Sequence, residues 1–444
     1  MINETVVAIS TPLTPSGVGI IRLSGKDPLG IAKKMFKPVG KTPVEKFEPN
    51  KMYAGEIQAE NFSDFGLCVF FKAPKSFTGE DTVEFHSHGG VAITKGILKK
   101  ALSLGARLAT RGEFTKMAFL NGKLSLASCE GLIDMINSES ESGVRAGYSL
   151  YTEKLTEKIN ELQDVLLDVL SQIDVDMDFP EEDLETVSRV NIKSQLNEVI
   201  KGIDGLLSTY QSGNIAKNGV KVGIVGKPNT GKSSILNALL NYEKAIVSSV
   251  AGTTRDIVEG SLDINGVRFN FFDTAGIRES DDEIENIGIR LSKKIVNSAN
   301  VLLFVLDGSD ITSEDQEIFE QIKDKNLITV LNKTDKGEYK DERADLNVSA
   351  LTGENIDALR DLLYSKSVSE VDFSAEFVCE ERHYEALKIA KERLLSALNE
   401  FDGVSLDIAT IDIKLGWESL GEITGKTASE EIINNIFMKF CVGK

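Results

Sequence analysis

The 444-residue chain lacks any apolar run close to the roughly 20 residues that a membrane-spanning helix needs, which excludes such a helix. It also has few cysteines. They are scattered and form no CxxC pair, so we expect structural thiols rather than disulfides. These cysteines are Cys68, Cys129, Cys379 and Cys441. The start Met1–Glu4 lacks the basic and apolar stretches of a secretory signal, so we expect a cytoplasmic protein.

Basic residues are fewer than acidic ones. The chain has 50 Lys and Arg against 69 Asp and Glu, which gives a net charge of −19. This balance disfavours a protein that coats nucleic acid by neutralising many phosphates, so any nucleic-acid contact must be local or shared with a partner. The composition, 41% hydrophobic and 27% charged, is that of a globular protein, and the length allows two or three domains.

Segments with different patterns predict a multidomain protein with α+β, all-α and α/β parts. Residues 1–118 combine Gly and Pro with short β-branched runs such as Gly19–Leu23, which is typical of an α+β domain. Residues 119–214 and 370–444 carry apolar residues spaced by three and four, which predicts paired amphipathic helices. Between them, predicted strands and helices alternate over residues 215–369. We therefore expect a doubly wound parallel sheet inserted into one helical domain.

The segment Gly226–Ser233 matches the phosphate-binding pattern GxxxxGK[ST] between a predicted strand and a predicted helix. The glycines of this pattern let backbone N–H groups and the helix N-terminus face phosphates. Lys232 would reach the β and γ phosphates, and Ser233 would bind Mg²⁺. For this motif alone, a Gly-rich turn of structural use is the alternative.

Further motifs of a nucleotide site follow in order. Asp273–Gly276 ends the next predicted strand, where a carboxylate can hold the Mg²⁺ shell and a Gly N–H can sense the γ-phosphate. Asn332–Asp335 ends a later strand, and Asp335 can accept hydrogen bonds from guanine N1–H and its 2-amino group, which adenine does not offer. Ser349–Leu351 can supply a backbone N–H to guanine O6. This order predicts a Ras-like P-loop domain that binds GTP.

The segment Gly252–Asp256 lies in a predicted loop, where Thr254 would complete the Mg²⁺ sphere and form a first switch. The residue after the last glycine of the Asp273–Gly276 motif is Ile277, whereas Ras-like switches carry there a glutamine that orients the attacking water. The water-positioning group must therefore come from elsewhere. The acidic stretch Glu279–Glu285 is the nearest source, and a solvated charge run is the alternative for most of it.

These central motifs, with others at both ends of the chain, resemble the MnmE (TrmE) family of tRNA-modification GTPases. The resemblance spans nearly the whole chain, whereas other GTPases share only the central motifs. The similar segments outside the centre are Ile20–Gly25, Ser76–Asp81, His88–Gly90, Gly112–Thr115, Ala118–Leu124, Phe179–Glu182 and Cys441–Lys444.

The resemblance implies an N-terminal domain that forms a homodimer and binds 5-formyltetrahydrofolate or a related one-carbon folate. The family's folate residues fall on Arg22, Glu84, Lys123 and Lys444. Arginine and lysine suit the carboxylates of the folate's glutamate tail, and a carboxylate suits the pteridine edge. From the residues alone, Arg22 and Lys123 could equally be surface charges, and Glu84 an exposed strand residue.

The resemblance also implies a K⁺ ion beside the phosphates, which takes the place of an arginine finger. Its ligands would come from Asn229, Ser248, Val250 and Thr253. The family's water-positioning glutamate falls on Glu285, and Arg278 matches an arginine of the second switch. Motifs and resemblance together place the GTP contacts at Asn229, Thr230, Gly231, Lys232, Ser233, Ser234, Ser248, Ser249, Val250, Ala251, Gly252, Thr253, Thr254, Asp273, Thr274, Ala275, Gly276, Asn332, Lys333, Asp335, Ser349 and Ala350.

The resemblance implies that this protein acts together with a flavin-containing partner, MnmG, in a heterotetramer or larger complex. This complex would add a (carboxymethyl)aminomethyl-type group to C5 of the wobble uridine of certain tRNAs. A GTP-controlled ribosome-assembly factor is the alternative, because related GTPases share the nucleotide motifs, but such a factor would be expected to carry a basic RNA-binding appendage. A folate-dependent transferase with a purely regulatory GTPase domain is a third possibility.

Overall fold

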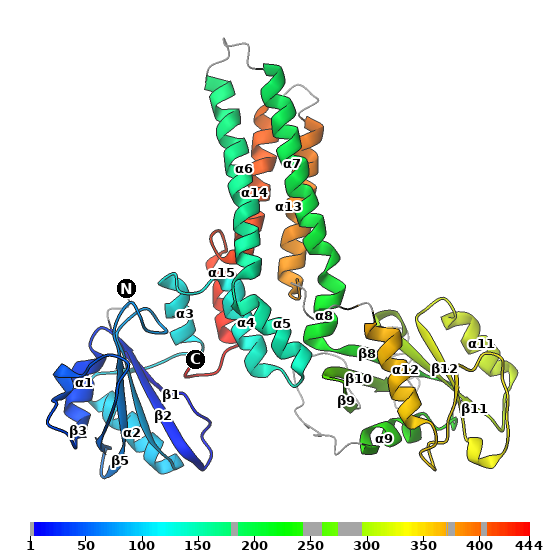
Figure 1. Ribbon diagram of the computed structural model, residues 1–444, viewed down its shortest axis with the longest axis horizontal. Coiled ribbons are helices and arrows are strands. Elements are labelled where there is room, and N and C mark those ends of the chain that lie inside the picture. Colours follow the sequence, from blue (N-terminus) through cyan, green and yellow to red (C-terminus); the bar gives the residue numbers. More distant parts are fainter. Residues whose placement is uncertain are drawn as a thin grey trace, which may run out of the picture. The chain divides into compact units, whose positions relative to one another are not determined.

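A computed structural model describes residues 4–178, 185–242, 260–273, 295–369, 371, 378–400 and 406–444. Within these ranges, the side chains of residues 176–178, 185–189, 241–242, 273 and 406 lie outside the description. Helices and sheets are both present in separate parts of the chain (Figure 1), which confirms the expected multidomain fold class. None of the described helices is both long and apolar enough to span a bilayer.

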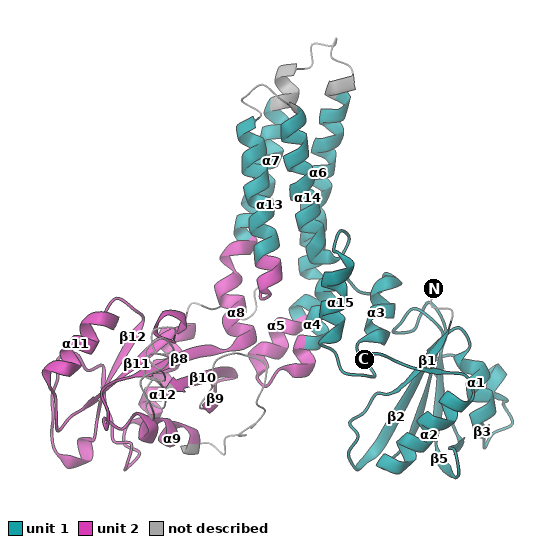
Figure 2. Cartoon of the chain, turned by 180° about the vertical axis from the view of Figure 1, so that it is seen from behind, with its two compact units in different colours: residues 1–133, 149–205, 385–444 teal, residues 134–148, 206–384 magenta. Residues whose placement is uncertain are grey.

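The chain divides into two compact units, drawn in teal and magenta in Figure 2. Unit 1 comprises residues 1–133, 149–205 and 385–444, and unit 2 comprises residues 134–148 and 206–384. The chain therefore leaves unit 1 and returns to it more than once. The expected boundaries at residues 118, 214 and 369 stay a prediction. The helix α8, Tyr210–Asn218, continues through residue 214 and ends before Gly219, whose φ is 78°.

The N-terminal part of unit 1 contains a seven-stranded sheet with the order β3-β4-β5-β6-β2-β1-β7. Figure 1 labels β1, β2, β3 and β5 of this sheet. Neighbouring strands are antiparallel except β1 and β7, which are parallel. The strands are β1 (Thr5–Ile9), β2 (Ser16–Gly25), β3 (Phe36–Pro38), β4 (Met52–Gln58), β5 (Ser63–Phe71), β6 (Thr82–Gly89) and β7 (Arg107–Leu108). The helices are α1 (Pro28–Met35), α2 (Val91–Ser103) and α3 (Glu113–Leu120).

Both faces of this sheet are covered. Val7 of β1 belongs to the core that α1 and α2 form on one face, whereas Val6 and Ala8 pack with Phe114 of α3 on the other. Successive side chains of a strand point to opposite faces, so a strand that is buried on both faces is apolar throughout. This explains why β1 reads as an unbroken apolar run, and it agrees with the α+β expectation for this segment.

The C-terminal residues pack against this sheet domain. Ser10 Oγ donates to the Gly443 carbonyl at 3.1 Å, and the Phe114 N–H donates to the Lys444 carbonyl at 3.2 Å. Gly443 has a φ of 103°, and a Cβ there would lie 2.4 Å from the Ile9 carbonyl oxygen. Only glycine fits this approach. The two ends of the described chain therefore share one domain.

The remainder of unit 1 is mainly a bundle of long helices. These are α6 (Lys154–Asp178), α7 (Glu185–Ser208), α13 (Glu381–Glu400) and α14 (Leu406–Thr424), with shorter α4 (Leu126–Asn137) and α15 (Glu430–Met438). Residues 134–137 of α4, 206–208 of α7 and 381–384 of α13 belong to unit 2. The apolar positions spaced by three and four are buried, for example Leu166 in α6 and Leu196 in α7. The expected helical segments are thus present. In the expected helical segment 119–214, the apolar residues spaced by three and four continue as far as Tyr210. This stretch is divided between two helices, because α7 ends at Ser208 and α8 begins at Tyr210.

Unit 2 contains a six-stranded sheet with the order β13-β12-β11-β8-β10-β9. Its strands are β8 (Val220–Val225), β9 (Gly260–Ile264), β10 (Val267–Asp273), β11 (Val301–Asp307), β12 (Leu327–Asn332) and β13 (Leu346–Asn347). Its helices include α9 (Lys232–Tyr242), α11 (Ser313–Ile322) and α12 (Ile356–Val368). The expectation of a parallel sheet needs one correction, because β9 is antiparallel to β10 and forms a hairpin with it through Asn265 and Gly266.

The sheet of unit 2 is covered by helices on both faces. Ile235 of α9 and Leu359 of α12 pack on one face with Val222 and Val305, whereas Ile322 of α11 packs on the other. The parallel pairing of β8 with β10 and β11, and of β11 with β12, brings the carboxyl ends of these strands to one edge. In such sheets, ligands bind outside this edge.

A buried ionic cluster joins three segments of unit 2. Lys217 of α8 lies 2.9 Å from Asp134 of α4 and also pairs with Glu380, which precedes α13. Burial and the neighbouring Glu380 carboxylate raise the pKa of Asp134 to about 8. Two carboxyl groups therefore share one ammonium group, and all three residues belong to unit 2. The helix α5 (Glu141–Tyr151) contacts the β9–β10 hairpin: the Ser142 N–H donates to the Gly266 carbonyl at 3.0 Å.

Candidate functional site

The loop between β8 and α9 adopts a backbone that ordinary residues disfavour. Gly226, Asn229 and Gly231 have φ values of 152°, 65° and 93°. A Cβ on Gly226 would lie 2.4 Å from the Val305 carbonyl oxygen, and one on Gly231 would lie 2.3 Å from Asn332 Nδ2. Glycine is therefore required at both positions by conformation and by space, and Asn229 is a residue type that tolerates the left-handed region.

The carbonyl oxygens of this loop accept hydrogen bonds from its own side chains. Lys232 Nζ donates to the carbonyls of Gly226 and Lys227, each at 2.9 Å. Thr230 Oγ1 donates to the Lys227 carbonyl at 3.1 Å. The side chain of Lys232 is thus folded over the loop from the first turn of α9. A loop of this shape suits phosphate, because its N–H groups and the helix N-terminus carry positive partial charge.

The segment after β12 holds the same loop from the neighbouring strand. Asn332, which is 2% exposed, donates from Nδ2 to the Thr230 carbonyl at 2.9 Å. Lys333 Nζ donates to the Asn229 carbonyl at 2.7 Å and pairs with Asp307 at 2.6 Å. The two motifs that are predicted to bind phosphate and base are therefore joined directly by hydrogen bonds, of which the one from Asn332 is buried.

Asp307 at the end of β11 was not recognised from the sequence. Burial disfavours its charge, but hydrogen bonds from Lys333 and Ser309 outweigh burial and hold the pKa of Asp307 below its ordinary value. It therefore stays ionised and holds the ammonium group of Lys333. Its position at a strand end could have indicated it. Asp307 is the last residue of an otherwise apolar strand, and it lies opposite Asn332, the last residue of β12.

The expected guanine-binding residues lie together. Ser349 Oγ donates to Asp335 Oδ1 at 2.6 Å, and the Ala350 N–H donates to Asn332 Oδ1 at 3.1 Å. Asp335 is exposed, whereas Ser349 is buried. The hydroxyl of Ser349 thus orients the Asp335 carboxylate. A carboxylate can accept from guanine N1–H and the 2-amino group, and this contact stays a prediction.

The structure describes part of the expected metal and switch residues. Ser233 and Ser234 lie in the first turn of α9, and Asp273 ends β10 opposite Ile224 of β8, at the same sheet edge as the phosphate loop. The hydroxyl of Ser233 is an oxygen ligand of the type that Mg²⁺ accepts, whereas the side chain of Asp273 lies outside the described residues. Ser248, Ser249, Val250, Ala251, Gly252, Thr253, Thr254, Thr274, Ala275, Gly276, Arg278 and Glu285 lie outside the described residues.

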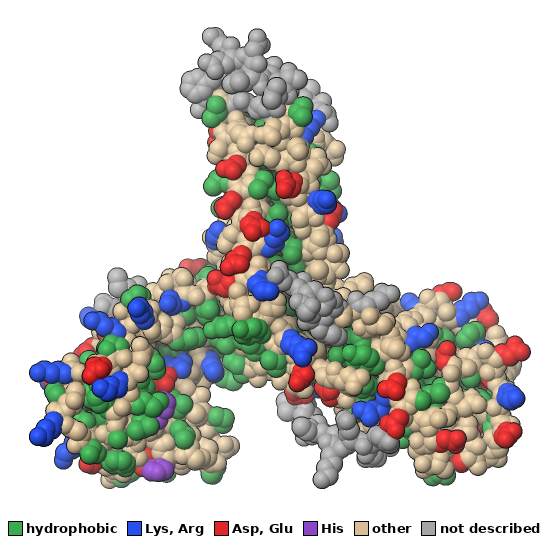
Figure 3. Space-filling view, viewed as in Figure 1, with side chains coloured by type: hydrophobic (Ala, Val, Ile, Leu, Met, Phe, Trp, Pro, Cys, Tyr) green, Lys and Arg blue, Asp and Glu red, His purple; other side chains and the backbone are tan. Residues whose placement is uncertain are grey.

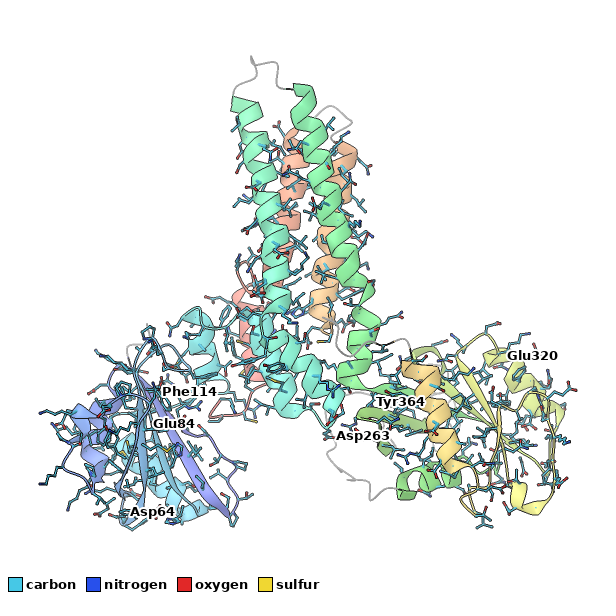
Figure 4. All side chains as sticks on the ribbon, viewed as in Figure 1. Asp64, Glu84, Phe114, Asp263, Glu320 and Tyr364 are labelled. Atoms are coloured by element: carbon cyan, nitrogen blue, oxygen red, sulfur yellow. The ribbon has the colours of Figure 1, made fainter. Side chains whose placement is uncertain are left out.

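In the N-terminal domain, Arg22 and Glu84 lie directly opposite each other on β2 and β6. Arg22 Nε donates to Glu84 Oε1 at 2.7 Å, and the Arg22 guanidinium lies 5.5 Å from the ring centre of Phe114. Figure 4 labels Glu84 and Phe114 in this domain. Burial opposes the charge of Glu84, but His86 and Arg22 outweigh it and lower the pKa of Glu84.

The other two expected folate residues come from neighbouring segments. The Lys444 backbone is fixed beside Phe114 by the hydrogen bond described above, and Phe114 in turn contacts Arg22. Lys123 Nζ donates to the Pro74 carbonyl at 3.2 Å. The structure thus brings Arg22, Glu84 and the Lys444 backbone into one neighbourhood, while Lys123 contacts the segment that leads to Phe77. A paired cation and carboxylate fit a ligand with carboxylate and amine edges.

Together, the twisted phosphate loop, the lysine folded over it and the carboxylate placed for guanine define a P-loop protein that binds and hydrolyses GTP. Comparison with known proteins gives a finer assignment. The family model of the MnmE helical domain matches residues 126–441, and that of the GTP-binding protein TrmE N-terminus matches residues 5–123. This chain belongs to the MnmE family of tRNA modification GTPases, as its motifs suggested.

Individual relatives agree along the whole chain. The tRNA modification GTPase MnmE of Aquifex aeolicus (strain VF5) is 40% identical over 453 residues, with 100% of both chains covered. That of Lactobacillus helveticus (strain DPC 4571) is 38% identical, with 99% of this chain and 98% of the relative covered. Among solved structures, Era in complex with MgGDPNP and nucleotides 1506–1542 of 16S ribosomal RNA is 30% identical. It covers 39% of this chain and 66% of its own, with a TM-score of 0.28.

The base site predicts a change of nucleotide preference. In Asp335→Asn, an amide presents one donor and one acceptor, which match xanthine rather than guanine. We expect the affinity for GTP to fall about 100-fold, or about 2.7 kcal/mol, and that for XTP to rise. Competition with a fluorescent guanine nucleotide measures both. Asp341→Asn is the control, because Asp341 pairs with Arg343 at 2.6 Å outside the motif. Equal losses for both nucleotides in Asp335→Asn would contradict the assignment.

Proposed function

We propose that this chain is a GTP- and K⁺-dependent tRNA modification enzyme. With a flavin-containing MnmG-type partner, it adds a (carboxymethyl)aminomethyl-type group to C5 of the wobble uridine of certain tRNAs, and a folate supplies the one-carbon unit. The observation that carries the proposal is similarity over the full length to relatives named tRNA modification GTPase MnmE. The nucleotide site and the N-terminal Arg22–Glu84 site within one chain support it.

In the nucleotide site, Ser233 and Thr254 would hold Mg²⁺, and Asn229 with Ser248, Val250 and Thr253 would hold K⁺. Bound cations stabilise the charge that develops on the phosphates during hydrolysis. Asn229 lies within the phosphate loop with a left-handed backbone, and its carbonyl accepts a hydrogen bond from Lys333. The backbone that carries the proposed K⁺ ligand is therefore held in place.

Glu285 would position the attacking water, with Arg278 beside it in the second switch. A carboxylate within reach of a water can orient it and accept its proton. The assignment supplies the group that Ile277 cannot provide.

In the N-terminal site, Arg22, Glu84, Lys123 and Lys444 would bind 5-formyltetrahydrofolate or a related folate. Glu84 is held ionised by Arg22 and His86, so it can accept hydrogen bonds from the amine edge of a pteridine. Arg22, Lys123 and Lys444 would neutralise the carboxylates of the glutamate tail.

The charge balance bears on the assembly. Acidic and basic side chains are interspersed on the described part of unit 2 that Figure 3 shows. A chain of net charge −19 would therefore contact tRNA locally, with the partner sharing the contact. We further propose a homodimer through the N-terminal domain, assembled with the partner into a heterotetramer or larger complex in the cytoplasm.

Deletion of the gene tests the proposed reaction. Nucleoside mass spectrometry on total tRNA should show loss of the C5-aminomethyl-type wobble uridines, and the unmodified or partly modified nucleoside should accumulate. The wild-type gene on a plasmid should restore them. Unchanged nucleosides together with altered ribosomal subunit profiles would instead favour a ribosome-assembly factor.

Hydrolysis should need K⁺ and be poorly supported by Na⁺. Asn229→Gly keeps the left-handed backbone accessible while it removes the side-chain oxygen. We expect this variant to lose the K⁺ response while it still binds GTP through Lys232 and Asp335. Asn229→Asp retains an oxygen and is the matched control. Phosphate release in KCl and NaCl measures the effect, and equal wild-type turnover in the two salts would contradict the proposal.

Folate binding should depend on Arg22 and Lys444. We expect Arg22→Gln, and removal of Lys444, to weaken binding of 5-formyltetrahydrofolate about 10-fold or more, because each loses a charge-assisted contact worth roughly 1.5–3 kcal/mol. GTP turnover should be unchanged, because unit 2 holds the GTP site. Arg107→Gln is the matched control, since Arg107 lies in the same domain and pairs with Glu113 at 2.5 Å. Calorimetry that finds equal affinity in all variants would refute the site.

A further inference from the structure

A buried lysine anchors the phosphate loop to a helix that takes no part in the nucleotide motifs. Lys227 is the second residue of the GxxxxGK[ST] segment, yet it is only 7% exposed. Its Nζ lies 3.1 Å from Asp315 Oδ2 and 3.2 Å from Asp310 Oδ2, and it donates to Thr312 Oγ1 at 3.3 Å. It also donates to the Asp310 carbonyl.

Asp315 serves two purposes at once. It lies in the first turn of α11, is fully buried, and its Oδ2 accepts from the N–H of Thr312 at 2.8 Å, which completes a capping box. The same oxygen pairs with Lys227. Among the described residues, its Oδ1 has no hydrogen-bond partner. Removal of the cation that pairs with a buried carboxylate is strongly destabilising, because the remaining negative charge is left uncompensated.

The backbone of Lys227 connects this ion pair to the phosphate-binding lysine. The Lys227 carbonyl accepts from Lys232 Nζ and from Thr230 Oγ1. Pro228 follows Lys227 and restricts its backbone to an extended conformation. Because the side chain is fixed to α11 and the backbone is restricted, the direction of the Lys227 carbonyl is determined, and with it the position of Lys232.

We infer that Lys227 and Asp315 are positioning residues for GTP, because their buried ion pair sets the carbonyl that orients Lys232. Neither residue contacts the nucleotide in this role. The lysine of a phosphate loop reaches the β and γ phosphates, so a displaced Lys232 weakens GTP binding more than GDP binding. The position of α11 is thereby linked to discrimination between the two nucleotides.

The test separates positioning from simple stability. Lys227→Met removes the charge and retains most of the aliphatic stem, but it leaves Asp315 buried without its cation. The double variant Lys227→Met with Asp315→Asn removes both charges, and asparagine can still cap α11. We expect the melting temperature to fall in the single variant and to recover in the double one, since removing both charges relieves the uncompensated buried carboxylate.

The readout is the ratio of the dissociation constants for GDP and for the imido analogue of GTP, titrated with the full-length chain in KCl and Mg²⁺. We expect a loss of about 10-fold, or about 1.4 kcal/mol, that is selective for the triphosphate in both variants. Partial unfolding would weaken both nucleotides equally and leave the ratio unchanged. Lys227→Arg keeps the charge and should stay close to the wild-type ratio.

Lys323→Met is the matched control, because Lys323 is the C-cap residue of the same helix. Lys323 pairs with Glu320, labelled in Figure 4, at 2.5 Å, but both side chains are about half exposed, at 45% and 50%. This variant should change neither the melting temperature nor the ratio. An unchanged ratio in the double variant, or an equal change in Lys323→Met, would overturn the inference. If Lys227→Met does not fold, the double variant alone decides.

Discussion

The carbonyl oxygens of the phosphate loop impose the constraint on which the rest of unit 2 depends. They have no sheet partner, so they must be satisfied by side chains, and the donors come from Lys232, Thr230, Asn332 and Lys333. Buried carbonyls without donors would each cost about 1–3 kcal/mol, which is a large share of the stability of a domain. The loop can therefore hold its phosphate-binding shape only if neighbouring strands end within reach of it.

The sheet topology meets this requirement. Parallel pairing of β8, β11 and β12 brings Val225, Asp307 and Asn332 to one edge, and the apolar cores on both faces fix these strands against the helices. A single residue, Asn332, then donates to the phosphate loop and accepts from the segment that would bind guanine O6. The segments for phosphate and base are consequently connected through one buried amide.

The sequence predicted the parts of this site whose residue types are dictated by chemistry. Gly231, Lys232 and Asp335 are limited by space, charge and hydrogen-bonding pattern, so a short motif finds them. Lys227 and Asp315 were missed because their pairing depends on a contact across 88 positions of the chain, and either residue alone reads as an ordinary surface charge. The antiparallel edge strand β9 was missed for a similar reason, since its partner rather than its composition determines its direction.

The C-terminal segment on the N-terminal sheet bears on how the chain folds as it is synthesised. The hydrogen bond between Ser10 and Gly443 spans 433 positions, whereas the sheet of unit 2 is built from the continuous stretch 206–384. Contacts of long sequence separation form slowly, and a ribosome delivers the N-terminal end first. The GTP-binding sheet can thus be complete while the first-made domain still waits for its last segment. The domain whose residues are synthesised first is therefore the one that is completed last.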